Sequence, residues 1–265
     1  MTQKLLTLCQ SLNMPQTATE EILSLSRELN FPALQPAMDM LFREETWEDG
    51  LSSLKMQLGD DSRGMKMLSC MLVCALQTRE NYRKLGIPED IFLATMDCFP
   101  RFVREHMESY GCCGFDRDFW TVRQLSGVLF RIGLLEYELS KGQVCLHIPT
   151  GARLIGPEID ASLEEARAFL RRFFPAWQSL PMTCHSWLLS PALPGLISPD
   201  SNILRFQKRF RIVPETEQNR EFLVWIFTNR DIPYPRLPEN THLQRVVKQY
   251  LLQGGTFVEG RGILL

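Results

Sequence analysis

The chain has 265 residues, of which 45% are hydrophobic and 23% are charged, and its formal net charge is −2. This ordinary globular composition argues against disorder. The small negative charge argues against nucleic acid as a partner, because proteins that bind nucleic acid usually carry a basic excess.

The eight cysteines indicate reduced thiols. Most lie within apolar runs, where a free thiol behaves as a small buried hydrophobe, and neither paired CxxC units nor HxH or HxxxH spacings are present, so we expect no metal. The most apolar run, "MLSCMLVCAL", is shorter than the ~18 residues of a membrane span. The N-terminus is too polar for a signal peptide. We therefore expect a soluble, cytoplasmic protein with no membrane partner.

Helical periodicity runs through the first 118 residues. It predicts helices over residues 17–30, 32–51, 62–86 and 89–111. Pro100 should kink or split the last of these helices. "GCCGFDRDF", residues 111–119, combines glycines with mixed charge and is typical of a domain junction. A further helical run over residues 119–133 ends at Gly133.

The periodicity changes after Gly133. "LLEYELS" and "QVCLHIP" alternate apolar and polar residues around a Lys-Gly pair and predict a β-hairpin. Further strands are predicted over residues 181–189, 211–215, 220–228 and 256–265, with helices over 161–175, 201–210 and 241–255. The continuous apolar run 220–228 is typical of a central strand. The predicted fold class is α+β, with a helical domain over 1–118 and a mixed α/β domain over 119–265.

Four segments carry a resemblance to a known family: "HIPTGARLIGPEI", "CHSWLLSPAL", "SNILRFQKRF" and "HLQRVVKQYLLQGG". They resemble a bacterial family of acyltransferases that joins a helical N-acyltransferase N-terminal domain to a GNAT-like C-terminal domain. The order of elements after residue 133 is also similar to the acyl-CoA-binding core of the GNAT superfamily. The resemblance covers nearly the whole chain and implies acyl-CoA or acetyl-CoA as co-substrate.

The resemblance also implies a site for the CoA pyrophosphate in the loop after the hairpin. Backbone amides at a helix N-terminus attract phosphate. The implied cofactor-binding residues are Gly151, Ala152, Arg153, Leu154 and Gly156, and the basic Arg205 and Lys208 could meet the 3′-phosphate of CoA. The same loop also reads as an ordinary connection, and the basic residues as a solvated helix face.

Three side chains are candidates for catalysis: His185, His147 and Glu138. His185 lies between Cys184 and Ser186, but neighbours in a strand point to opposite faces, so these three residues do not form a nucleophile–base pair. A histidine is suited to proton transfer at neutral pH, and Glu138 could deprotonate an amine. The alternatives are buried structural histidines and a solvated face carrying Glu136 and Glu138.

The resemblance implies an acyl-CoA-dependent N-acyltransferase in which an amine of a small molecule or peptide attacks the thioester directly. In many GNAT enzymes a tyrosine protonates the departing thiolate, and the nearest position here is Phe206, which has no proton to give. The alternative is therefore a non-catalytic acyl-CoA-binding or protein-interaction module on the same fold. An acyl carrier protein as the acyl donor is a third hypothesis, and the oligomeric state stays open.

Overall fold

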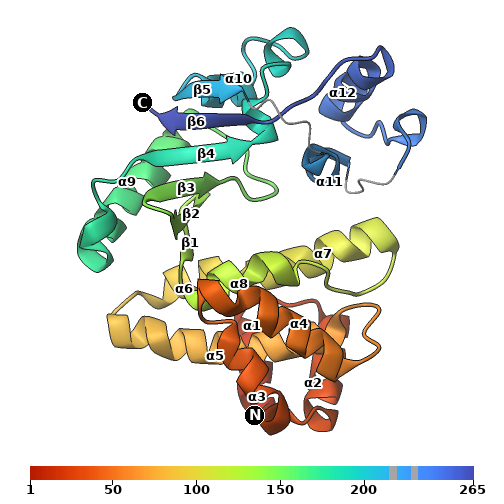
Figure 1. Cartoon of the computed structure of the whole chain (residues 1–265), viewed down its shortest axis with the longest axis vertical. Coiled ribbons are helices and arrows are strands. Elements are labelled where there is room, and N and C mark those ends of the chain that lie inside the picture. Colours follow the sequence, from red (N-terminus) through yellow and green to blue (C-terminus); the bar gives the residue numbers. More distant parts are fainter. Residues whose placement is uncertain (215–219, 228–231) are drawn as a thin grey trace. The chain divides into compact units, whose positions relative to one another are not determined.

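The computed structural model describes residues 1–214, 220–227 and 232–265. The chain divides into two compact units, Met1–Ile132 and Gly133–Leu265, which are coloured red to green and green to blue in Figure 1. The first unit is mainly helical and the second contains a mixed sheet, so the predicted α+β class is confirmed. The predicted domain boundary after residue 118 concerns independent folding and stays a prediction.

Helices make up almost all of the first unit. Its helices are α1 (Thr2–Ser11), α2 (Gln16–Glu28), α3 (Phe31–Met40), α4 (Trp47–Leu58), α5 (Met65–Leu85), α6 (Glu89–Met96), α7 (Cys98–Tyr110) and α8 (Asp118–Ser126), followed by strand β1 (Leu129–Ile132). A short 3-10 turn, η1 (Glu44–Thr46), precedes α4. The longest helix, α5, is almost wholly buried from Met67 to Ala75 and contacts α1, α2, α3, α4, α6 and α8.

Three predicted helices of this unit are divided. The run 32–51 forms α3 and α4 with the 3-10 turn between them. The run 89–111 splits at Asp97, which places Pro100 in the first turn of α7, where a missing amide costs no intrahelical hydrogen bond. The run 119–133 stops at Gly127, which takes the left-handed conformation of a helix C-cap, and the residues after it form β1.

The second unit is built on a mixed sheet. Its strands are β2 (Leu135–Ser140), β3 (Gln143–His147), β4 (Met182–Ser186), β5 (Phe210–Pro214) and β6 (Gly260–Leu264), in the order β2-β3-β4-β6-β5. Strands β3 and β4 are parallel, and the other pairs in this order are antiparallel. The hairpin between β2 and β3 is confirmed, and its turn residues Lys141 and Gly142 both have positive φ, as a tight hairpin turn requires.

One face of this sheet is apolar and packs on α9 (Gly156–Phe173). Leu135, Tyr137, Val144 and Leu146 are all buried on this face. The hydroxyl of Ser162 on α9 accepts a hydrogen bond from the backbone amide of Leu135. It also lies 2.9 Å from the Tyr137 hydroxyl. Burial and these hydrogen bonds together attach α9 to the hairpin.

Strand β6 carries glycines where it faces the chain segment after β4. A Cβ on Gly260 would lie 2.3 Å from the carbonyl oxygen of Leu189, and a Cβ on Gly262 would lie 2.9 Å from Cδ1 of Leu189. These two glycines therefore let the 3-10 turn Trp187–Leu189 lie against β6. The Gln207 side chain donates hydrogen bonds to the carbonyls of Leu188 and Ser190, which holds this turn in place.

The predicted central strand over 220–228 is wrong. Residues Glu221–Phe227 form helix α11, and Thr228 lies outside the described residues. Phe222, Leu223, Ile226 and Phe227 are buried, which is the spacing of one face of a helix. A short apolar run satisfies both strand and buried-helix patterns, and tertiary packing decided between them.

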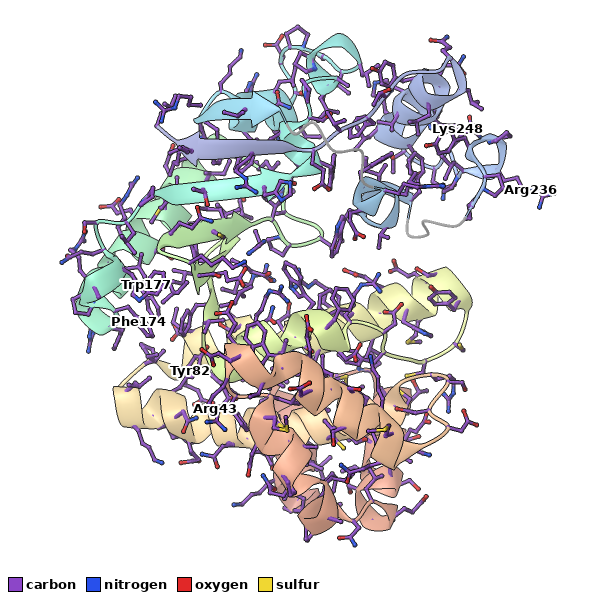
Figure 2. The ribbon with its side chains drawn as sticks, viewed as in Figure 1. Arg43, Tyr82, Phe174, Trp177, Arg236 and Lys248 are labelled. Carbon is purple, nitrogen blue, oxygen red and sulfur yellow. The ribbon has the colours of Figure 1, made fainter. Side chains whose placement is uncertain are left out.

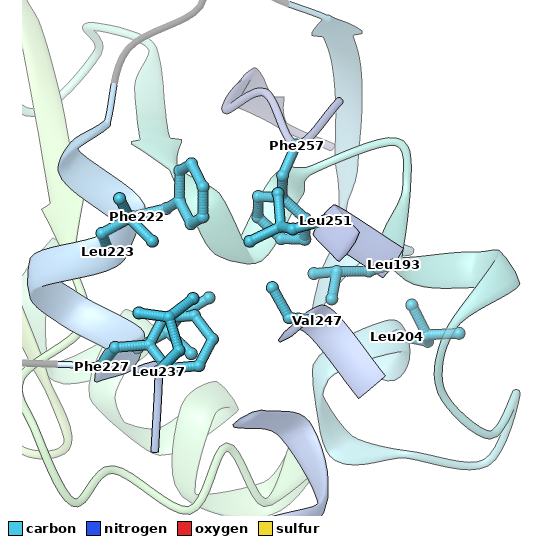
Figure 3. Packing of buried hydrophobic residues seen from close by; sticks show 10 residues of the cluster. Leu193, Leu204, Phe222, Leu223, Phe227, Leu237, Val247, Leu251 and Phe257 are labelled. Atoms are coloured by element: carbon cyan, nitrogen blue, oxygen red, sulfur yellow. The ribbon is translucent and has the colours of Figure 1, made fainter. Parts of the chain in front are cut away.

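Helix α11 belongs to an apolar cluster with α10 (Asn202–Gln207) and α12 (His242–Leu252), shown in Figure 3. Thr241 and Gln244 form a capping box at the start of α12. The side-chain amide of Gln244 also donates to the carbonyl of Ile226 near the end of α11. Lys248 donates to the carbonyl of Leu237, beside the turn that carries Arg236 (Figure 2). No described helix is long and apolar enough to cross a membrane.

Candidate functional site

The sheet of the second unit opens between its two parallel strands. The pairing of β3 with β4 ends at Leu146 and Cys184. Beyond that point β3 stays paired with β2 as far as His147, and β4 stays paired with β6 as far as Ser186. His147 and His185 are therefore the first residues past the last β3–β4 pair, at the carboxyl ends of two neighbouring strands.

Both histidines point to the sheet face opposite α9. Cys145 and Thr183 pair across β3 and β4, and the Thr183 hydroxyl lies 3.6 Å from Cys145 Sγ. His147 and His185 each follow two residues later, so they project on the same side. We call this side the polar face. The strand registers place on it, among others, Glu136, Glu138, Cys145, His147, Thr183, His185 and Arg261.

His147 contacts a buried carboxylate. Its Nε2 lies 2.8 Å from Glu138 Oε2, with 22% of the His147 side chain and 11% of the Glu138 side chain exposed. Glu136 is also buried, directly opposite His147 in the hairpin. The interpretation of Glu136 and Glu138 as a solvated strand face is therefore wrong. The structure brings together two of the three side chains predicted as catalytic.

His185 contacts a second buried carboxylate. Its Nε2 lies 3.3 Å from Glu259 Oε2, and the exposed fractions are 45% for the His185 side chain and 9% for the Glu259 side chain. Glu259 directly precedes β6 and lies far along the chain from His185, so no motif in the sequence pointed to it. A buried carboxylate behind an exposed imidazole orients the ring.

The cysteines near the opening are poor nucleophiles. Burial raises the pKa of the Cys145 thiol, and this effect outweighs a hydrogen bond from Thr183 that lowers the pKa. Burial also raises the pKa of Cys184 well above its usual range, with Cys145 and Glu259 adding to the effect. Since the thiolate is the reactive form of cysteine, neither residue is suited to forming an acyl-enzyme near neutral pH. His185 and Cys184 also lie on opposite faces, as predicted from their adjacency.

The loop after β3 leads directly from the opening to the N-terminus of α9. Gly151 and Leu154 both have positive φ, and no side chain caps the first turn of α9. The Ala152 amide donates to Pro149 within a turn. Arg153 lies near Glu158, 3.3 Å away, and is 74% exposed. Backbone amides at the start of an 18-residue helix favour an anion there.

The end of α10 reaches this loop. Asn202 donates to the carbonyl of Arg153 at 2.8 Å, and Arg209 donates to the carbonyl of Gly156 and to the carboxylate of Asp160. The Arg209 guanidinium lowers the pKa of Asp160. The sequence did not predict the contacts of Arg209 or of Asn202.

The other predicted phosphate contacts stay predictions. Arg205 lies 3.8 Å from Asp200, and Lys208 is exposed at the C-cap of α10. Phe206, at the position where the resemblance implies a proton donor, is buried against Phe210. Among the described residues, no group of three or more His, Cys, Asp or Glu side chains could hold a metal ion.

Two family models together match nearly the whole chain. The model of the GNAT-like C-terminal domain matches residues 129–264, and that of the N-acyltransferase N-terminal domain matches residues 3–127. The predicted pair of domains and the GNAT-like fold are thereby confirmed. Comparison with curated protein sequences gives no significant match.

Solved acyltransferase structures share the fold of the chain. An acyltransferase in complex with decanoyl-CoA and teicoplanin is 24% identical with a TM-score of 0.81, over 97% of this chain and 86% of that one. An acyltransferase mutant in complex with octanoyl-CoA is 23% identical with a TM-score of 0.83, over 99% and 87%. An acyltransferase in complex with decanoyl-CoA is 25% identical with a TM-score of 0.79, over 97% and 86%.

Proposed function

Because the chain belongs to the family defined by a GNAT-like C-terminal domain, we propose that it transfers an acyl group from a CoA thioester to an amine of a small molecule or peptide. One observation carries the proposal. The β3–β4 opening brings two histidine–carboxylate pairs to the start of the loop that leads to α9. Proton-transfer groups and an anion-attracting helix end therefore lie in neighbouring parts of one unit.

The donor would bind along the loop 148–155. Its pyrophosphate would accept hydrogen bonds from backbone amides at the start of α9, with Gly151, Ala152, Arg153, Leu154 and Gly156 forming the site. Gly156 leaves room there, since a Cβ on it would meet only Arg209 Nη2, at 3.6 Å. Arg205 and Lys208 would contact the 3′-phosphate. The similar structures contain decanoyl-CoA or octanoyl-CoA, which supports a CoA thioester as co-substrate.

The thioester would lie at the opening beside His185. The exposed imidazole is accessible to an acceptor from solvent, and Glu259 orients it, so His185 would take the proton of the attacking amine. Direct attack needs no enzyme nucleophile, which agrees with the raised pKa values of Cys145 and Cys184. Aligning the two reactants would supply a large part of the rate enhancement.

The first test is isothermal titration of the full chain with acetyl-CoA and octanoyl-CoA, using two variants of equal size. Gly156→Glu places a negative charge at the phosphate position, whereas Gly156→Gln adds the same bulk without charge. A carboxylate in the first turn also favours the helix, so the Glu variant should stay folded. We expect micromolar binding by the native protein, at least tenfold weaker binding by Gly156→Glu, and a smaller loss with Gly156→Gln.

Turnover is tested next, by following CoA release with a panel of amines. Release of CoA with formation of an amide supports the proposal. Binding without turnover would favour the non-catalytic module, for which the buried Phe206 is the supporting observation. If folded protein binds neither thioester, the CoA-dependent function is wrong.

A further inference from the structure

Attack of an amine on a thioester moves two protons. The nitrogen forms a bond to the carbonyl carbon and must lose a proton, and the carbon–sulfur bond breaks so that the departing sulfur takes the electron pair and must gain a proton. The products are an amide and a thiol, with atoms and charge balanced and no further reactant. A site that assists both transfers needs a base near the nitrogen and an acid near the sulfur.

The polar face contains a pair of matching groups for these transfers. Each of two imidazoles contacts a buried carboxylate: His147 contacts Glu138, and His185 contacts Glu259. They lie at the ends of two adjacent parallel strands, one residue past the last pair of the β3–β4 ladder. Within such a ladder, neighbouring strands are about 4.8 Å apart. One acyl carbon at the opening could therefore have an imidazole on each side.

We propose that the two pairs divide the two proton transfers: His185 takes the proton of the amine, and His147 gives a proton to the sulfur of CoA. This inference rests on the proposed function. Glu259 and Glu138 act as positioning residues, since each contacts its histidine. Protons return from His185 to His147 through solvent between turnovers.

The surroundings of the two rings decide which histidine accepts the proton of the amine and which one protonates the sulfur. His185 is twice as exposed as His147, so it is accessible to an acceptor arriving from solvent. His147 directly precedes the loop to α9, where the donor would be held, so it is nearer to the group that departs with CoA. Among the described residues, the charged or titratable groups on the side of the two rings include Glu136 and Glu138 from β2 and Cys145 from β3. Arg261 from β6 and Glu259, which precedes β6, also lie on this side.

The test bypasses one proton transfer at a time. A selenoester of CoA keeps the recognition elements of the donor but releases a more acidic selenol, which needs no acid. Methoxyamine is a weaker base than benzylamine. After its nitrogen bonds to the carbonyl carbon, it loses its proton more readily, so it needs less help from a base. Octanoyl-CoA and octanoyl-seleno-CoA are combined with both amines, and kcat and KM are measured for the native protein and for His147→Gln, His185→Gln, Glu138→Gln and Glu259→Gln.

We expect each histidine variant to lower kcat by about 10²–10⁴-fold with octanoyl-CoA and benzylamine. The defect of His147→Gln should shrink at least tenfold with the selenoester and not with methoxyamine. The defect of His185→Gln should shrink with methoxyamine and not with the selenoester. Glu138→Gln and Glu259→Gln should lower kcat by less. The defect of Glu138→Gln should shrink with the same substrate as that of His147→Gln, and the defect of Glu259→Gln with the same substrate as that of His185→Gln. A purely structural role would not produce this pattern.

Two results would overturn the inference. If the selenoester and methoxyamine change the kcat defects of both histidine variants alike, the two proton transfers are not divided between the histidines. If native protein releases CoA and either histidine variant keeps full kcat, that histidine transfers no proton. Absence of turnover by the native protein would overturn the proposed function itself. That outcome is distinct from the two above, which both require turnover by the native protein. Thermal unfolding and titration with octanoyl-CoA show that each variant is folded and still binds the donor.

Discussion

The two faces of the sheet in the second unit are made by alternate residues of the same strands, yet one is apolar and the other carries polar and charged side chains. In β3, Val144 and Leu146 are buried against the side that carries α9, whereas Cys145 and His147 point to the polar face. One face is closed by a helix and by hydrogen bonds to Ser162. The other holds buried carboxylates in contact with imidazoles.

This difference separates stability from chemistry within single strands. A change on the apolar face should cost folding free energy and affect catalysis only through unfolding. A change on the polar face should affect proton transfer and leave the fold nearly intact. Substitutions at neighbouring positions therefore test the division directly.

The largest effect on stability is expected for Leu146→Ala. Leu146 is 1% exposed, and truncating a buried leucine removes transfer free energy and leaves a cavity, with a cost of about 2–5 kcal/mol. Urea denaturation followed by circular dichroism measures it. The neighbouring Cys145→Ala on the polar face is the control, for which we expect a clearly smaller loss. Equal losses for the two variants would contradict the division between the faces.

An intermediate effect is expected for Gly260→Ala. Because the added Cβ would meet the Leu189 carbonyl oxygen at 2.3 Å, backbone must move, with a cost of about 1–3 kcal/mol. Gly260 follows Glu259, so the shift should also disturb the contact with His185 and lower turnover. Denaturant unfolding and CoA release are measured in parallel. Gly195→Ala, whose Cβ would meet none of the described residues within 4 Å, should change neither. A Gly260→Ala variant with unchanged stability would contradict the close approach.

The smallest effect is expected for Tyr137→Phe. The Tyr137 hydroxyl is buried 2.9 Å from Ser162 Oγ, and burial raises its pKa well above the usual range. Removing one neutral hydrogen bond costs about 0.5–1.5 kcal/mol, because Ser162 keeps its bond from the Leu135 amide. Thermal unfolding measures the change, and donor affinity should be unaltered. A large fall in affinity would mean that α9 moves with this contact.

Alternation and turn chemistry predicted the hairpin well. "LLEYELS" and "QVCLHIP" form β2 and β3, and Lys141 and Gly142 make the turn, because local sequence determines both the period and the positive φ. The apolar run at 220–228 was misread because a short buried helix and a buried strand have the same composition. Only packing in the cluster of α10, α11 and α12 selects the helix.

The candidate site was predicted in part for the same reason. His185, His147 and Glu138 were identified because residue type and strand face can be read locally, and the structure adds that Glu138 contacts His147. Glu259, Asn202 and Arg209 acquire their contacts from segments distant in the chain. No local pattern encodes such a contact, since it depends on which strand or helix becomes a neighbour.

Local sequence thus determined the periodicity of most elements, the hairpin with its turn and the face on which each histidine lies, because these depend on bonded geometry and nearest neighbours. Tertiary structure decided that β6 lies between β4 and β5, that α11 is a helix and that β3 and β4 separate at His147 and His185. These features depend on pairing and burial between distant segments, where hydrophobic packing and hydrogen bonding outweigh local preference.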